Sequence, residues 1–161
     1  GVTETVICGT PAGVGEPWFD SVESIISHAA FSLGGVKGVE FGAGFAAADM
    51  KGSECNDPLR VSGGRIVTTT NNNGGVNGGI TNGMPIVFRC AVKPTPSIAQ
   101  QQDTVDFIKN ENTQLSIHGR HDPAIIRRIC PVLDSVAALC VADMLSLRYG
   151  TDVLTKGVDD K

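Results

Sequence analysis

The sequence predicts an α+β fold in which helices pack with antiparallel sheet. Segments typical of strands and of helices follow one another without the regular strand–helix–strand rhythm of a parallel sheet. Residues 104–110 and 113–119 have the composition of two strands and lie close enough together to form a hairpin. The length of 161 residues corresponds to about one domain and suffices for a buried core.

The first third of the chain is predicted to form a strand, a helix, a second strand and a short helix. Residues 3–9 ("TETVICG") alternate threonine with β-branched residues, as strands do. A helix is predicted within residues 13–35, with Pro17 in its first turn and the pair Gly34–Gly35 as its stop. Its predicted apolar face consists of Phe19, Val22, Ile25, Ile26, Ala29 and Leu33. A short strand at residues 36–42 and a short helix at 45–53 follow.

The remainder combines irregular segments with strands and one long helix. Residues 52–83 show little periodicity, residues 84–93 have the composition of a strand, and the hairpin strands are predicted to join through Glu111–Asn112. The last predicted helix, residues 131–150, precedes a polar and loose tail at 151–161. Its predicted apolar face consists of Val132, Val136, Leu139, Cys140, Met144 and Leu147.

Composition excludes several classes of function. With 41% hydrophobic and 19% charged residues the chain is expected to be a folded, soluble protein. The formal net charge of −4 argues against a surface for nucleic acid or anionic membrane. No stretch is expected to reach the roughly 20 apolar residues that span a bilayer, and the N-terminus lacks the features of a signal peptide. Five cysteines without a CxxC pair favour reduced, mostly buried thiols in a cytoplasm over disulfides or zinc.

Two segments have a composition that suits ligand binding, each with a structural alternative. Residues 71–83 ("NNNGGVNGGITNG") contain five glycines, which let backbone approach a ligand closely and let N–H groups form an anion-binding nest. A surface connector is the favoured alternative for this loop. Residues 93–97 ("KPTPS") form a segment stiffened by two prolines, which presents polar groups in fixed directions or simply ends a strand.

A third segment, "GRHDP" at residues 119–123, is equally consistent with a helix start and with a site. Asp122 suits an N-cap and Pro123 the first helical position. Neither role accounts for Arg120 and His121, which stand where a helix N-terminus favours anions. An arginine fork suits phosphate, and an aspartate close to a cation and a ligand is able to pass protons.

Taken in order, the segments resemble the C-terminal half of chorismate synthase. They are "GVGEPWFD", "VKGVEFG", "KGSECNDP", "NNNGGVNGGITNG", "AVKPTPS", "GRHDP" and a final alanine-rich helix, spread over residues 6–149. Each is weak alone, and seven in one order are specific. The resemblance implies part of that family's β-α-β sandwich, with residues 1–150 as the C-terminal portion of the catalytic domain and 151–161 as the tail.

The resemblance also implies a reaction and its cofactor. The family eliminates phosphate from 5-enolpyruvylshikimate 3-phosphate in an anti-1,4 sense to give chorismate, a step of aromatic amino-acid biosynthesis by the shikimate pathway. It needs reduced FMN, with NADPH involved only indirectly, to reduce the flavin. The family implies a cytoplasmic homotetramer that binds neither nucleic acid nor membrane.

Residue by residue, the resemblance assigns Asp122 to proton exchange with flavin N5. Arg120 is assigned to the flavin and to the substrate phosphate. The remaining FMN-binding residues are expected to be Gly34, Gly35, Gly78, Lys93, Pro94, Thr95, Pro96 and Ser97.

Two segments of the family do not occur in this sequence: one containing Gly-Glu-Ser-His and one containing Ser-Ala-Arg. They carry a catalytic histidine and part of the arginine cluster that holds the substrate. The sequence is therefore expected to be a fragment that is inactive alone. The alternative is a non-catalytic, self-associating module with a vestigial flavin site.

Overall fold

A three-stranded antiparallel sheet forms the centre of the molecule in the computed structural model, which describes residues 1–119 and 124–157. Its strand order is β1–β7–β2, with β1 at Val2–Ile7, β7 at Ile86–Val92 and β2 at Val36–Phe41. The two edge strands both run antiparallel to the central strand. The three strands expected at residues 3–9, 36–42 and 84–93 are thus confirmed within a residue or two.

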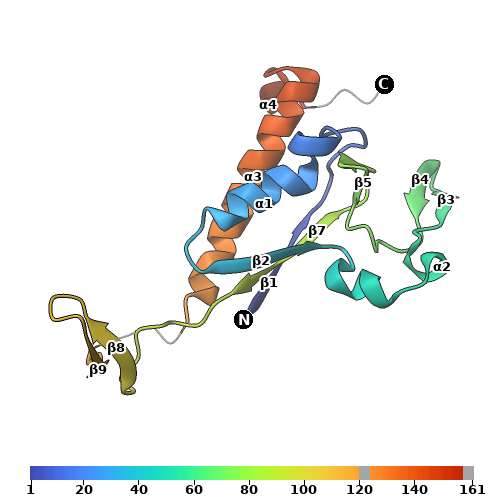
Figure 1. Ribbon diagram of the computed structural model, residues 1–161. Coiled ribbons are helices and arrows are strands. Elements are labelled where there is room, and N and C mark those ends of the chain that lie inside the picture. The colour runs from blue at the N-terminus through green and yellow to red at the C-terminus, as the bar shows by residue number, and fades with distance from the viewer. Residues whose placement is uncertain (120–123, 158–161) are drawn as a thin grey trace.

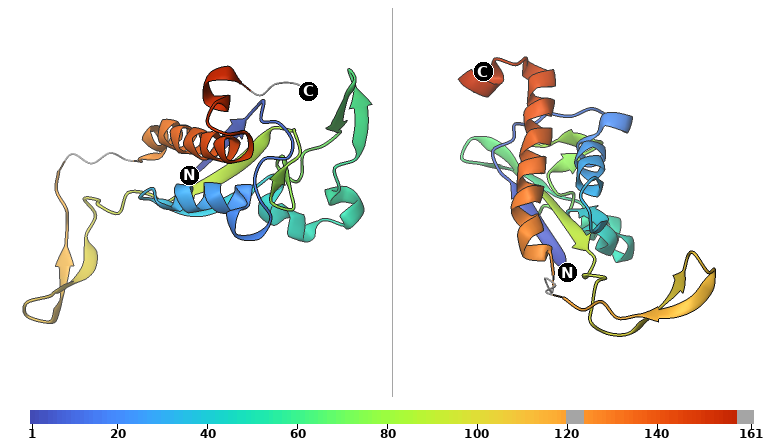
Figure 2. Two further views of the ribbon diagram at one scale, coloured as in Figure 1. Left: turned by 90° about the horizontal axis from the view of Figure 1, so that it is seen from above. Right: turned by 90° about the vertical axis from the view of Figure 1, so that its left-hand side faces the viewer.

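Two helices, α1 (Val22–Phe31) and α3 (Ile126–Tyr149), pack against each other and against one face of this sheet (Figures 1 and 2). The hydroxyl of Thr5 on β1 donates a hydrogen bond of 3.1 Å to Oδ1 of Asp134 on α3. A single apolar core lies between the helices and the sheet, which bears out the α+β prediction. Its largest fully buried side chains are Phe88, Ile26, Ile86, Leu133, Val14, Val22 and Cys90.

Helix α1 begins later than the sequence predicted. Ser21 is its N-cap, and the Ser21 side chain accepts a hydrogen bond of 3.1 Å from the backbone N–H of Ser24. Pro17 instead precedes a separate 3₁₀ turn, η1 (Trp18–Asp20). Phe19 was predicted on the apolar face but is 84% exposed. The serine oxygen satisfies one of the free N–H groups of the first turn, which favours a helix start there over one at the proline.

The buried face of α3 is not the predicted one. The structure buries Ile129, Leu133, Ala137, Val141 and Met144, and of the predicted face only Met144 is fully buried. The helix also begins at Ile126, five positions before the predicted start, and includes Pro131. Apolar residues occur on both sides of α3, so spacing alone did not determine which side faces the sheet.

The expectation that no stretch is long and apolar enough to span a bilayer is wrong for α3. This helix of 24 residues passes that test by length and composition. The core helix of a folded domain passes the same test. In this fold the buried side chains of α3 pack against β1 and α1.

Three hairpins extend from the core: β3–β4 (Leu59–Ser62, Arg65–Thr68), β5–β6 (Val76–Asn77, Ile80–Thr81) and β8–β9 (Gln102–Asp106, Glu111–Leu115). Two short helices, η2 (Gly44–Asp49) and α2 (Gly52–Cys55), follow β2. The β8–β9 hairpin projects away from the body (Figure 1).

The turn of the β8–β9 hairpin lies at residues 107–110, before the position predicted for it. The Asp106 carboxylate accepts hydrogen bonds from the backbone N–H groups of Ile108 and Lys109, and Asn110 adopts a φ of +58°. Aspartate and asparagine form turns in this way, and that local chemistry outweighs strand propensity.

The C-terminal segment and the cysteines also differ from expectation. Within the tail, α4 (Val153–Lys156) follows α3, and its first residue is buried. All five cysteines are free, but only Cys90 is fully buried, so the description "mostly buried" is wrong. Burial raises the pKa of the Cys90 thiol.

Candidate functional site

Two of the predicted flavin-binding segments meet at one end of the central sheet. The backbone N–H of Lys93, just after β7, donates a hydrogen bond of 2.8 Å to the carbonyl oxygen of Gly35, just before β2. The neighbouring residues Val92 and Val36 are paired in the sheet. The chain therefore brings its glycine pair and its proline-stiffened segment side by side, as one site would require.

The two glycines of the pair differ in what the fold requires of them. Gly35 has a φ of +100°, and a Cβ there would stand 2.7 Å from Cδ1 of Ile125. Gly34 has no such backbone constraint, and a Cβ there would meet no atom within 4 Å. The fold therefore requires a glycine at Gly35. At Gly34 the fold sets no such requirement.

The segment Lys93–Ser97 leaves the sheet without forming a helix or strand. Lys93, Pro94 and Pro96 are exposed, whereas Thr95 and Ser97 are half-buried. Proline fixes its own φ and restricts the residue before it, so this edge is held in one extended shape. The ammonium group of Lys93 is exposed on this edge, beside the glycine pair.

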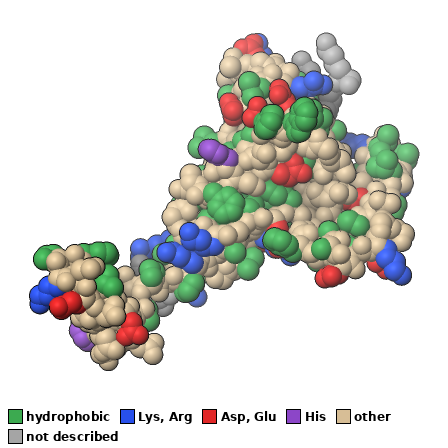
Figure 3. Space-filling model, viewed as in Figure 1, with side chains coloured by type: hydrophobic (Ala, Val, Ile, Leu, Met, Phe, Trp, Pro, Cys, Tyr) green, Lys and Arg blue, Asp and Glu red, His purple; other side chains and the backbone are tan. Residues whose placement is uncertain are grey.

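The first turn of α3 lies at the same end of the sheet. Its N-cap residue, Ile125, reaches the position where Gly35 would carry a Cβ. A helix N-terminus carries a partial positive charge. Figure 3 shows lysine and arginine side chains gathered on the body near the base of the projecting hairpin. The exposed cationic residues of these elements are Lys37, Lys93, Arg127 and Arg128. This end of the molecule is suited to anions.

The two residues assigned to chemistry, Arg120 and Asp122, lie outside the described residues. The described chain resumes at Ala124, next to Ile125. The helix start proposed for Asp122 and Pro123 also falls outside the described residues, and α3 itself begins at Ile126.

Gly78 lies elsewhere. It forms the turn of the β5–β6 hairpin with a φ of +58°, it is exposed, and a Cβ there would meet no atom within 4 Å. The next residue, Gly79, accepts a hydrogen bond of 3.0 Å from the N–H of Val22 at the start of α1. Gly35 follows the other end of that helix, which is about 15 Å long for its ten residues. The structure therefore does not bring Gly78 to the other predicted residues within this chain.

The asparagine-rich loop is held by a residue that sequence reasoning did not single out, Asp57. Its Oδ1 accepts hydrogen bonds of 2.7 Å from the N–H of Asn72 and from the hydroxyl of Thr70. Its Oδ2 accepts 2.9 Å and 2.8 Å bonds from the backbone and side-chain N–H groups of Asn73. Partial burial raises the pKa of Asp57, but these hydrogen bonds outweigh burial, and the pKa lies below its ordinary value. The loop is anchored and does not behave as a loose connector.

Asn71 continues this network toward the sheet. Its side-chain amide donates to the carbonyl oxygen of Pro85 at 2.8 Å and accepts from the N–H of Gly75 at the same distance. The residues just before β7 are thereby tied to the loop that precedes β5. The run of asparagines indicates in the sequence that this loop is anchored, because the short side chain of asparagine readily forms hydrogen bonds with nearby backbone groups.

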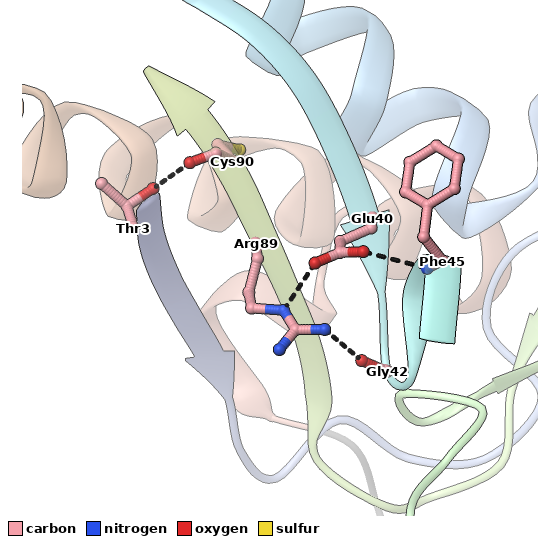
Figure 4. Close-up of polar contacts among 6 residues, drawn as sticks. All are labelled: Thr3, Glu40, Gly42, Phe45, Arg89 and Cys90. Atoms are coloured by element: carbon pink, nitrogen blue, oxygen red, sulfur yellow. Dashed lines mark hydrogen bonds and ion pairs between the residues drawn. The ribbon is translucent and has the colours of Figure 1, made fainter. Parts of the chain in front are cut away.

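A second polar cluster, also missed from the sequence, lies on the sheet surface (Figure 4). Arg89 on β7 pairs with Glu40 on β2, with Nε 2.9 Å from Oε1, and donates to the carbonyl oxygen of Gly42 at 3.2 Å. Oε2 of Glu40 accepts a 3.0 Å bond from the N–H of Phe45. These bonds fix the turn between β2 and η2. The cluster contains no predicted site residue, and we assign it to structure.

A groove of about 810 Å³ lies away from the predicted residues. It runs between the loop before α1 and the end of α3. Its lining carries three carboxylates and one guanidinium group, a poor match for a phosphate-bearing ligand. The lining residues are Gly15, Glu16, Pro17, Asp20, Ile25, Asp143, Met144, Leu147 and Arg148.

Comparison with known proteins decides the family. The family model of chorismate synthase matches residues 1–146. The chain belongs to the chorismate synthase family. It is 51% identical over 150 residues to a chorismate synthase of Methanosarcina barkeri, covering 93% of this chain and 41% of that protein. It is 53% identical over 156 residues to a chorismate synthase of Chitinophaga pinensis, covering 97% of this chain and 46% of that protein.

Fold similarity agrees with the sequence match. A crystal structure of chorismate synthase superposes with a TM-score of 0.75 at 32% identity, over 94% of this chain and 39% of that one. The chain therefore has the fold of a chorismate synthase segment, which confirms the family and the fold class inferred from the seven motifs. It spans less than half the length of the chorismate synthases it matches.

Proposed function

We propose that this chain is part of a chorismate synthase, a lyase that expels phosphate from 5-enolpyruvylshikimate 3-phosphate in a reduced-FMN-dependent anti-1,4-elimination. The hydrogen bond between Lys93 and Gly35 is the observation that carries the proposal, because it joins two segments expected at the flavin. The identity of 48–53% to chorismate synthases supports it from a separate direction. The reaction belongs to the complete enzyme, of which this chain covers 41–46%.

The residues at this end of the sheet fit a flavin phosphate or a substrate phosphate. Arg127 lies in the first turn of α3, whose N-terminus carries a partial positive charge, and Lys93 is exposed at the same end of the sheet. The backbone at Gly34 is open to a planar ring, and the two prolines keep the facing edge in place. When bound, reduced FMN supplies electron density for the bond that breaks.

The two chemical roles fall to Arg120 and Asp122. The guanidinium group of Arg120 would hold the departing phosphate through paired hydrogen bonds, which stabilises charge that grows as the bond breaks. The Asp122 carboxylate would accept and return a proton at the flavin. Both residues precede Ile125 in the sequence by a few positions, and Ile125 borders Gly35.

The experiment is to mix the chain with 5-enolpyruvylshikimate 3-phosphate and dithionite-reduced FMN under anaerobic conditions and to follow phosphate release. We propose that the isolated chain binds FMN and does not turn over, since its relatives are more than twice as long. In a full-length relative, replacing the aspartate that corresponds to Asp122 with asparagine is expected to abolish most activity. Robust turnover by the isolated chain contradicts its proposed inactivity.

A second candidate function, a self-associating module without catalysis, rests on one observation. Large apolar side chains are exposed on α3 and η1, with Leu139 at 71%, Leu147 at 73%, Trp18 at 86% and Phe19 at 84%. Exposed apolar surface of this kind marks contact with another protein surface. Titration with FMN separates the candidates: saturable, salt-sensitive binding supports the flavin site, and its absence supports the module.

A further inference from the structure

The motif "KGSECNDP" at residues 51–58 lies outside the predicted flavin-binding segments, yet it is bonded to the asparagine-rich loop. The carbonyl oxygen of Glu54 accepts a hydrogen bond of 3.2 Å from the side chain of Asn72. The carboxylate of Asp57 accepts bonds of 2.7 Å and 2.9 Å from the backbone N–H groups of Asn72 and Asn73. The motif thereby fixes the first part of the loop, and the Asp57 carboxylate contributes both of its oxygens.

The anchored part of the loop has little room to shift. A Cβ on Gly42 would overlap the carbonyl oxygen of Asn72, and a Cβ on Gly74 would stand 2.5 Å from the backbone nitrogen of Gly42. The N–H of Val87 donates a hydrogen bond of 3.1 Å to the carbonyl oxygen of Gly74. Backbone packs directly on backbone here, so a displacement of residues 72–74 would also displace the turn after β2 or the start of β7.

From this loop the chain passes into β5 and then into the turn at Gly78. The side chain of Asn71 accepts from the N–H of Gly75 at 2.8 Å, and the carbonyl oxygen of Gly75 accepts from the N–H of Asn82 at 3.0 Å. The side chain of Asn82 donates to Oδ1 of Asn77 at 2.7 Å. Asn77 directly precedes Gly78. Hydrogen bonds therefore follow the chain from the anchored loop to both sides of the turn.

The two strands of the β5–β6 hairpin are supported by different parts of the chain. Thr81 on β6 exchanges backbone hydrogen bonds with Gly13 and Val14 at 2.8 Å and 2.9 Å. Strand β5 continues instead from the loop that Asp57 holds. Because the two strands are paired with each other, the position of the turn between them depends on both supports.

We propose that Asp57 is a positioning residue of the flavin site: by holding residues 70–73 it places the Gly78 turn where the turn contacts the cofactor. This inference rests on the proposed function, which assigns Gly78 to flavin. Gly78 is exposed, with open space where a side chain would be, so its backbone is accessible to a ligand. Asp57 acts through the loop and makes no contact with the cofactor itself. A charged acceptor forms stronger hydrogen bonds than a neutral one, so a carboxylate suits this anchor better than an amide.

Two variants that weaken the anchor by different amounts test the role. Asp57→Asn places an NH₂ group against donors that had a carboxylate oxygen. Asn73→Ala removes the side-chain bond to Asp57 and keeps the backbone bond. The matched control is Asp134→Asn, because Asp134 also joins two elements by accepting a hydrogen bond, from Thr5 at 3.1 Å. FMN affinity is measured by flavin fluorescence quenching at a temperature at which every variant is folded.

Asp57→Asn is expected to lower FMN affinity at least about fivefold, Asn73→Ala is expected to lower it less, and the control should bind as the unaltered chain does. Amide hydrogen exchange of Asn77 and Ile80, which pair across the turn, should accelerate in the same order. A purely structural role predicts reduced stability without this loss of affinity, because the affinity is measured on folded chain.

The outcomes separate the inference from the proposed function. An Asp57→Asn chain that binds FMN as tightly as the unaltered chain overturns the positioning role. A loss of affinity without faster exchange at Asn77 and Ile80 overturns it as well, because the carboxylate would then act on the cofactor by another route. An unaltered chain that binds no FMN overturns the proposed function itself, and the positioning role falls with it.

Discussion

The N–H of Lys93 bonds to the carbonyl oxygen of Gly35 at 2.8 Å, which places the end of the central strand beside the end of the first helix. Both residues come from segments that sequence patterns single out for different reasons, one rich in proline and one in glycine. Each segment alone is a weak indication of a ligand site, and their contact places both at the same end of the sheet. The stability and shape of that location depend on the glycine pair.

Replacing Gly35 by alanine is expected to destabilise the fold by about 1–2 kcal/mol, because a φ of +100° is costly for any residue with a Cβ. The new methyl group would also push on Cδ1 of Ile125, although that flexible atom is able to move. Gly34→Ala is the matched control and should change the free energy of unfolding by less than about 0.5 kcal/mol. Urea unfolding measures both, and equal losses would contradict the distinction between the two glycines.

Removal of the Asp57 carboxylate is expected to loosen the asparagine-rich loop. Asp57→Ala leaves the N–H groups of Asn72 and Asn73 without their acceptor, at a cost of about 2 kcal/mol for hydrogen bonds to a charged group. Amide hydrogen exchange should accelerate at these two residues and remain unchanged in β7. Asp103→Ala, which removes one exposed acceptor of Gln114, is the control and should leave exchange in the loop as it was.

The same carboxylate should make stability depend on pH in a defined direction. The pKa of Asp57 is lower in the folded chain than its ordinary value, since the hydrogen bonds from Asn73, Thr70 and Asn72 outweigh the effect of partial burial. Its stabilising contribution is therefore complete above the unfolded pKa of about 3.9 and is lost as pH falls through the lower folded pKa. The stability difference between the unaltered chain and Asp57→Asn should be constant from about pH 5 to 7 and shrink below about pH 4. A difference that grows on acidification would exclude this role.

The Glu40–Arg89 pair on the sheet surface should be coupled in stability. Glu40→Ala removes the partner of Arg89 and also the acceptor of the Phe45 N–H. A double-mutant cycle with Arg89→Ala is expected to give a coupling energy of about 1 kcal/mol, since the side chains are only partly exposed, at 26% and 34%. Additive losses in the cycle would show that the two residues act independently.

The sequence alone predicted the elements with strong local chemistry. β-Branched runs identified the three strands of the sheet, and Gly34–Gly35 marked the end of α1 because a glycine there permits the positive φ that follows a helix. The order of seven motifs predicted the family, since such an order does not depend on how any single segment folds. Each of these features depends on only a few consecutive residues, which is why the sequence alone predicts it.

Other features depend on partners distant in sequence and could not be predicted in this way. Asp57 bonds to Asn73, and Arg89 bonds to Glu40, across loops and strands whose pairing the sequence does not state. The position of Gly78 far from Lys93 follows from the direction of β7 and from the tie between Gly79 and α1. The motifs assign Gly78 and Lys93 to the same ligand, but whether the two residues lie close together depends on how the strands and helices are arranged.

The buried face of α3 provides the sharpest test of the fold. Leu133 and Leu139 lie on the same helix and receive the same change to alanine, so the effect on helix propensity is the same in both variants. Leu133 is 1% exposed against the sheet and Leu139 is 71% exposed. Leu133→Ala should cost about 2–5 kcal/mol through lost burial and a residual cavity. Leu139→Ala should stay within about 0.5 kcal/mol when unfolding is measured on dilute chain. The reverse order of the two losses would restore the face predicted from spacing and reject the packing of α3 on β1.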